Sequence, residues 1–231
     1  MEKLKDKRSL FMFLYGIVTV VSFYTVTELV GIDTSPAYQY STYLKEIIIA
    51  LIPLLITISF PVIRKMFINS FVLSPLALKM TWVYITGFFL FQYLIMKITY
   101  DYGILISNSW RIFYNLEIPY ITHFQYPVLG FSLYAIARVL IVPIIEEFFY
   151  RVFLITFFNK WVNIWVAVVL QMIIFSMNHP FSPFSAGVFG LLLGTLYVRT
   201  KSIIPGLILH SLWNLYSALI MNFDLWFIPR W

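Results

Sequence analysis

Cysteine is absent from the 231-residue sequence. Its absence excludes disulfide bonds, cysteine-ligated metals and a cysteine nucleophile. Charge is scarce as well, because charged residues make up 11% of the chain, against about 25% in a typical soluble domain. Hydrophobic residues reach 61%. This composition predicts an integral membrane protein.

The chain also lacks a long polar linker, so residues 1–231 are predicted to form a single integral membrane domain. Its first apolar run is longer than a signal-peptide core and has no small-x-small cleavage pattern, so we expect it to be retained. The predicted fold is all-α: a polytopic membrane helical bundle with about seven transmembrane helices. The candidate spans lie near 10–30, 45–63, 80–98, 127–158, 162–178, 184–199 and 203–222.

The net charge of +6 would suit a nucleic-acid-binding protein, but the basic residues occur at the ends of apolar runs. We therefore expect a lipid bilayer, and no nucleic acid, as a partner. The positive-inside rule places the N-terminus in the cytoplasm and Asp224–Trp231 outside, and the composition favours a bacterial plasma membrane. Four basic sets share the predicted cytoplasmic side: Lys3, Lys5, Lys7 and Arg8; Arg64 and Lys65; Lys160; Arg199 and Lys201.

Two glutamates and an arginine interrupt the apolar run 127–158. Ions inside a membrane are costly when isolated and are usually paired and functional. Glu147 and Arg151 lie four residues apart in the favourable order for a helical ion pair. Glu146 is rotated by about 100° from Glu147 and is left without a local cation. Pro143, nearly one turn earlier, is expected to kink the helix. A purely structural pair of Glu147 and Arg151, which Glu146 merely joins, is the alternative explanation, and the unpaired second acid favours a functional one.

Other polar residues end or interrupt the later apolar runs. His179 ends the fifth run, and His210 and Asn214 share one helical face in the seventh. Buried polar groups in lipid must find partners, so we expect these three to meet Glu146. Counted along straight helices, the depths of Glu146, His179 and His210 differ by roughly 12 Å, a gap that helix tilt must close. His123 lies in a polar loop and is expected to be an ordinary surface residue.

Glycines recur at spacings of three and four in the sixth run, at Gly187, Gly190 and Gly194. They fall on one helical face, and small residues at this spacing allow close helix packing in a bilayer. We therefore expect a tight contact between this helix and a neighbour.

Three motifs occur in a fixed order: Glu-Glu-x-x-x-Arg at 146–151, Phe-x-x-x-His at 175–179 and His-x-x-x-Asn at 210–214. They resemble the motifs of the CAAX protease and bacteriocin-processing (CPBP/Abi) family of intramembrane glutamic endopeptidases. The resemblance covers a catalytic core of about 127–222. It implies hydrolysis of a membrane-associated peptide or membrane protein, with a bacterial role in peptide or bacteriocin processing or in self-immunity.

The resemblance also assigns roles to the motif residues. It implies that Glu146 and His179 activate a water molecule without an acyl-enzyme, and that His210 and Asn214 donate hydrogen bonds to the oxyanion. Glu147, held by Arg151, would orient the site or the substrate. It implies no metal and no cofactor.

Two other readings of the residues stay open. A zinc-dependent membrane protease would use Glu146, His179 and His210 as ligands, although the sequence has no His-Glu-x-x-His helix. A non-enzymatic protein would use the polar cluster to bind a bacteriocin or another partner, or as a proton relay. The sequence leaves the oligomeric state open.

Overall fold

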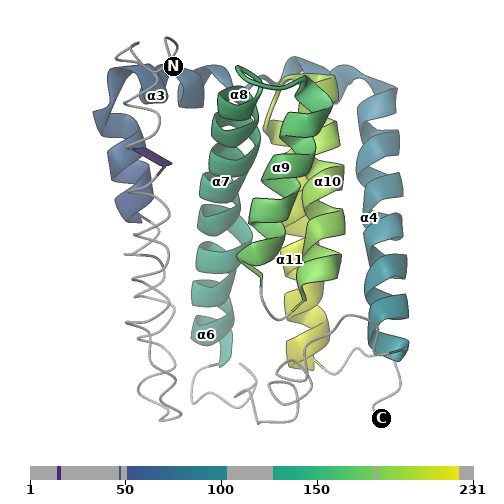
Figure 1. The fold of residues 1–231 in the computed structure, drawn as a ribbon. Coiled ribbons are helices and arrows are strands. Elements are labelled where there is room, and N and C mark those ends of the chain that lie inside the picture. The colour runs from purple at the N-terminus through teal and green to yellow at the C-terminus, as the bar shows by residue number, and fades with distance from the viewer. Residues whose placement is uncertain (1–14, 17–46, 48–50, 103–126, 180–181, 224–231) are drawn as a thin grey trace.

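The computed structural model describes residues 15–16, 47, 51–102, 127–179 and 182–223. Among these residues every regular element is helical, which confirms the predicted all-α class for this part of the chain. Figure 1 shows long helices standing side by side in a bundle, with α3 (Pro61–Asn69) at one end. Apart from Tyr15 and Gly16, the first predicted span lies outside the described residues.

The fourth apolar run forms one helix from Pro127 to Phe158, as predicted, but its winding changes along its length. Two π-helical stretches alternate with α-helix, and such stretches occur often at functional sites. In order the parts are α6 (Pro127–Tyr134), η4 (Ala135–Ile141, π), α7 (Val142–Glu146), η5 (Glu147–Leu154, π) and α8 (Ile155–Phe158).

The other helices follow the predicted apolar runs closely. Proline occupies the first turn of both α10 and α11, where its missing N–H costs no hydrogen bond. The elements are η2 (Ser74–Ala77), α4 (Lys79–Asp101), α9 (Ile164–Met177), α10 (Pro183–Thr200) and α11 (Ile204–Phe223).

The second apolar run was predicted as one span near 45–63, but the helix there is bent close to its end. The helix Leu51–Ser59 meets the segment Pro61–Ala77 at 109°. Phe60 is extended, as a residue before proline tends to be, and so the upstream helix ends there. Arg64 lies within α3.

Among the described helices, α4 is long and apolar enough to cross a membrane, over Lys79–Thr99. The bent pair Leu51–Ser59 and Pro61–Ala77 adds a second span if it is one broken span. The count of seven spans and the single domain stay predictions. The loop with His123 and the C-terminal segment Asp224–Trp231 lie outside the described residues.

The predicted glycine face forms the contact between α10 and α9. A Cβ on Gly190 would lie 3.0 Å from Phe175, and one on Gly194 would lie 3.0 Å from Val168. Gly187 faces the same helix. These small residues bring α10 against α9, as the spacing predicts. The contact fixes Phe175, which the site below uses.

Candidate active site

The two glutamates and Arg151 are buried in the helix Pro127–Phe158. Glu147 and Arg151 have no exposed surface, and Glu146 is 7% exposed. The Arg151 Nη2 atom lies 3.3 Å from the Glu147 Oε1 atom, which confirms the predicted i,i+4 pair. The buried aromatic side chains of the core surround this pair, so the ions lie in a region of low polarity.

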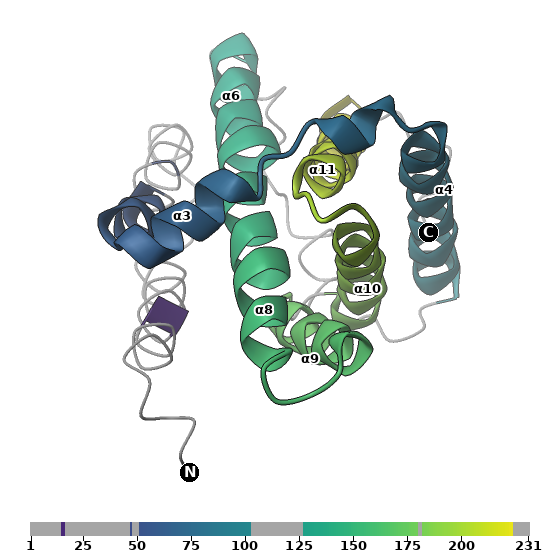
Figure 2. The same ribbon diagram turned by 90° about the horizontal axis from the view of Figure 1, so that it is seen from above.

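His210 of α11 contacts both glutamates. Its Nδ1 lies 2.9 Å from Glu147 Oε1, and its Nε2 lies 3.5 Å from Glu146 Oε2. A carboxylate oxygen accepts, so Nδ1–H donates to Glu147. The expected depth gap between Glu146 and His210 is closed, and in Figure 2 the helix Pro127–Phe158 is inclined across the bundle, whereas α11 is seen more nearly end-on.

The second oxygen of Glu147 lies against Gly206, one turn before His210. A Cβ at Gly206 would come within 2.7 Å of Glu147 Oε2, closer than real Cβ contacts. Glycine is therefore required here by close approach, and α11 holds Glu147 at two points, Gly206 and His210. Sequence reasoning missed Gly206, although its spacing of four from His210 is a signal.

Arg151 is held by charge and by an aromatic ring. Its Cζ lies 4.5 Å from the centre of the Phe175 ring, a cation–π contact in a buried place. Among the described residues none accepts a well-formed hydrogen bond from its guanidinium nitrogens. Removing the carboxylate of Glu147 would therefore leave a buried and uncompensated cation.

His179 is hydrogen-bonded to its own helix. Its Nδ1 lies 2.8 Å from the Phe175 carbonyl oxygen, one turn earlier on α9. A carbonyl oxygen only accepts, so Nδ1 carries a proton, and the neutral ring keeps its lone pair on Nε2. Within the described part of the chain His179 makes no ion pair with Glu146, whose histidine neighbour is His210. The Phe175 ring lies 4.4 Å from the His179 ring and 6.3 Å from the His210 ring, between centres.

A hydrogen bond between two further residues ties the end of α9 to η5. The Asn178 amide nitrogen donates to the Tyr150 hydroxyl. Asn178 precedes His179, and Tyr150 follows Glu146 by four residues. Sequence reasoning missed this pair, because the two residues are 28 positions apart.

Replacing Tyr150 by phenylalanine is expected to lower the cleavage rate several-fold. This loss should exceed what the accompanying loss of stability explains. The variant keeps the buried ring but leaves the Asn178 amide without its acceptor, and one such loss costs about 1 kcal/mol. His179 would then lose its tie to η5. Cleavage rate and thermal unfolding of the purified variant are the measurements. A Tyr84→Phe variant, in which the exchanged tyrosine lies on α4, is the control. Unchanged cleavage by Tyr150→Phe would show that the tie is dispensable.

Asn214 is hydrogen-bonded to the helix Pro127–Phe158. Its Nδ2 donates to the Arg138 carbonyl oxygen over 2.7 Å, joining α11 to η4. In a π-helical stretch a carbonyl pairs with the N–H five residues later, and for Arg138 that residue is Pro143, which has none. The irregularity predicted at Pro143 thus takes the form of a wide π-helical stretch, in which the Asn214 amide donates to the Arg138 carbonyl.

Residues 128–216 match a family model described as type II CAAX prenyl endopeptidase Rce1-like. This part of the chain is similar to the Rce1-like family. The match spans all three motifs and confirms the family resemblance predicted from them. Rce1-like proteins are membrane proteins and endopeptidases, so the match implies a protease with a peptide or protein substrate. Among curated proteins and solved structures, none matches the chain.

Metal ligation was the alternative for Glu146, His179 and His210. Across the described residues of the Rce1-like segment and its neighbours, no group of three or more His, Asp or Glu side chains is placed to hold a metal ion. The arrangement is instead two carboxylates bridged by one imidazole, with a second imidazole at the end of α9. Such a set can move a proton and position a carbonyl group.

Proposed function

We propose that the chain is an intramembrane endopeptidase that cleaves a membrane-associated peptide or protein without a metal. It acts in a bacterial plasma membrane, with about seven spanning helices and a cytoplasmic N-terminus. The observation that carries the proposal is the buried contact of His210 with both Glu146 and Glu147 inside the segment that matches the endopeptidase family. Its biological role is peptide or bacteriocin processing, or self-immunity.

Glu146 is the proposed general base. It takes a proton from a water molecule while the water oxygen attacks the carbonyl carbon of the scissile bond. The C–N bond then breaks, and the proton passes from the Glu146 carboxyl to the leaving amine nitrogen. His179, whose Nδ1 is engaged by the Phe175 carbonyl, offers its Nε2 lone pair to the same water. A positioned general base of this kind contributes about 10²- to 10⁴-fold to a rate.

His210 and Asn214 are the proposed oxyanion donors. Glu147, held by Arg151 and Gly206, accepts a hydrogen bond from Nδ1–H of His210. Nε2, which faces Glu146, must therefore carry a proton as well to donate to the oxyanion, so His210 acts as the imidazolium. The Asn214 amide has two N–H donors, one of which is engaged by the Arg138 carbonyl. That bond anchors the amide, and the second N–H is free to meet an oxyanion.

Pro143→Ala is expected to raise stability and lower activity. Alanine restores the missing N–H, which competes with Asn214 for the Arg138 carbonyl, and an interior proline costs a helix about 3 kcal/mol. We expect a higher unfolding temperature, together with a kcat lower by about tenfold because the oxyanion donor is no longer anchored. Pro183, in the first turn of α10, is the matched control position, where alanine should change little. A full kcat in Pro143→Ala would show that catalysis does not need the hydrogen bond between Asn214 and the Arg138 carbonyl.

The endopeptidase proposal is tested by comparing peptides released from bacterial membranes with and without the chain, each with and without a metal chelator. Peptides that appear only with the chain and persist in chelator support it. Loss of these peptides in chelator would support the zinc-dependent alternative. Protection of cells from a bacteriocin without any new peptide would support the non-enzymatic alternative.

A further inference from the structure

One end of the helical bundle carries most of the exposed cations among the described residues, whereas Arg138 lies nearer the other end. The described acids lie elsewhere, because Asp101 ends α4 at the opposite end and the two glutamates are buried. Among the described residues this end therefore carries an excess of positive charge. The exposed cations there are Arg64, Lys65, Lys79, Lys160, Arg199 and Lys201.

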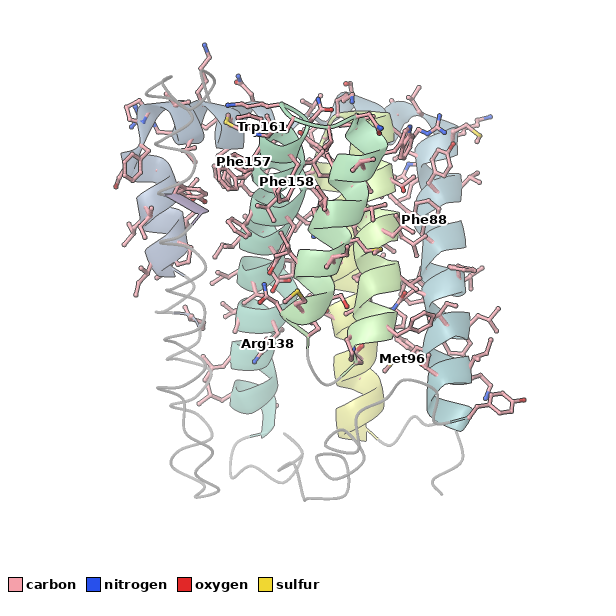
Figure 3. All side chains as sticks on the ribbon, viewed as in Figure 1. Phe88, Met96, Arg138, Phe157, Phe158 and Trp161 are labelled. Carbon is pink, nitrogen blue, oxygen red and sulfur yellow. The ribbon has the colours of Figure 1, made fainter. Side chains whose placement is uncertain are left out.

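Exposed apolar side chains accompany two of these cations, Arg64 and Lys65, in residues 60–78, which we call the surface strap. Val62, Ile68 and Leu73 of the strap are 45%, 61% and 68% exposed. Figure 2 shows α3 running across the end of the bundle. Trp161 lies at the same end (Figure 3) and is exposed, as tryptophans of a membrane interface are. A short helix with mixed cationic and apolar exposure, lying across the end of a membrane bundle, fits the plane of the lipid headgroups.

The inner face of the strap contacts the helix Pro127–Phe158, which carries Glu146 and Glu147. Ile63 is 1% exposed, and the Phe67 ring packs edge-on against Phe148 with 5.0 Å between centres. Phe148 directly follows Glu147 in the sequence. The strap thus touches the residue next to the carboxylate that orients His210.

The end of the strap is bonded to the start of α11. The Ile203 N–H donates to the Ser70 carbonyl over 3.0 Å, and the Ser202 hydroxyl donates to the Val72 carbonyl over 2.7 Å. Gly206, which abuts Glu147, follows within one turn. The strap therefore holds both helices that meet at Glu147, one through a ring contact and the other through backbone bonds.

We propose that the surface strap binds anionic phospholipid headgroups through Arg64 and Lys65, and that this binding seats Glu147 and His210. The lipid-binding part stands without the proposed function, and the seating part rests on it. Lipid is favoured over an acidic peptide because exposed apolar side chains are interleaved with the cations on the strap. A basic residue near an anionic surface contributes about fivefold to binding, so the two together contribute roughly thirtyfold at low salt.

The test uses the full chain reconstituted in vesicles of phosphatidylcholine alone or of equimolar phosphatidylcholine and phosphatidylglycerol. Association of spin-labelled phosphatidylglycerol and of spin-labelled phosphatidylcholine is compared for three proteins: the native chain, Arg64→Gln/Lys65→Gln, and Lys160→Gln/Lys201→Gln. The last variant loses the same charge at the same end. We expect the strap variant to lose most of its preference for phosphatidylglycerol and the control to retain most of it.

The cleavage rate of the chain in the same vesicles tests whether lipid binding positions Glu147 and His210. The native chain is expected to cleave faster with phosphatidylglycerol than without it, and the strap variant is expected to show no such difference. Equal loss of lipid preference in both variants, or no loss in either, would overturn lipid binding by the strap. A raised KM for an acidic peptide with unchanged lipid preference would assign the strap to peptide instead. If the strap variant loses its lipid preference but still cleaves faster with phosphatidylglycerol than without it, only the positioning of Glu147 and His210 by lipid would be overturned.

Discussion

Replacing Glu146 by glutamine is expected to lower kcat by about a thousandfold, within the range that a positioned general base contributes. Glutamine has the size of glutamate but cannot take a proton from water. The 3.5 Å approach of Glu146 to His210 is an ion-pair contact without a short hydrogen bond, so the fold should tolerate the change. The measurements are the rate at which the reconstituted variant releases peptide and its unfolding temperature.

Glu146→Asp and His179→Gln complete this experiment. Aspartate keeps the base but withdraws it by one methylene, so partial activity is expected. His179→Gln should lose activity without disturbing the Glu147–His210 contact, because within the described residues the His179 side chain is hydrogen-bonded to the Phe175 carbonyl and not to Glu147 or His210. A Glu146→Gln enzyme within a few-fold of the native rate would rule out Glu146 as the base.

Gly206→Ala is expected to reduce kcat by about a hundredfold, the amount by which one lost oxyanion donor lowers a rate. The new Cβ would lie 2.7 Å from Glu147 Oε2, and Glu147 is fully buried between Arg151 and His210. Moving the carboxylate to relieve the overlap breaks its contact with His210. Loss of kcat with little change in KM would be the signature of a misplaced His210, since substrate binding is not directly touched.

Other glycines provide matched controls for this substitution. A Cβ at Gly87 on α4 meets nothing within 4 Å, so Gly87→Ala should leave kcat unchanged and slightly raise stability. Shortening the carboxylate in Gly206→Ala/Glu147→Asp should recover part of the loss, because the overlap falls on the end of the side chain. A double variant no more active than Gly206→Ala would place the defect in α11 itself.

Much of the site was predictable because its chemistry is local in sequence. The Glu147–Arg151 pair follows from a spacing of four residues, and the glycine face of α10 follows from spacings of three and four. Both are properties of a single helix, which the apolar runs predicted well. The order of the three motifs indicated the family, which the match over 128–216 confirms.

The partners of each polar group were less predictable. Sequence reasoning paired Glu146 with His179, whereas His210 contacts both carboxylates and His179 bonds to its own helix. Which imidazole reaches a carboxylate depends on helix tilt and rotation, and a π-helical stretch changes both. The bend at Phe60 was missed, although Pro61 is a sequence signal that the upstream helix ends there.

Apolar runs and charge spacing are thus enough to predict helices, one ion pair and a family, because hydrophobicity and helical geometry act within a single segment. Close approach between segments depends on packing. Three such contacts join residues from different helices. They are the close approach of Gly206 to Glu147, the Asn178–Tyr150 hydrogen bond and the Asn214–Arg138 hydrogen bond. These contacts arise only when the inclined helix Pro127–Phe158 meets α9 and α11, and they set the positions of His179, His210 and Asn214.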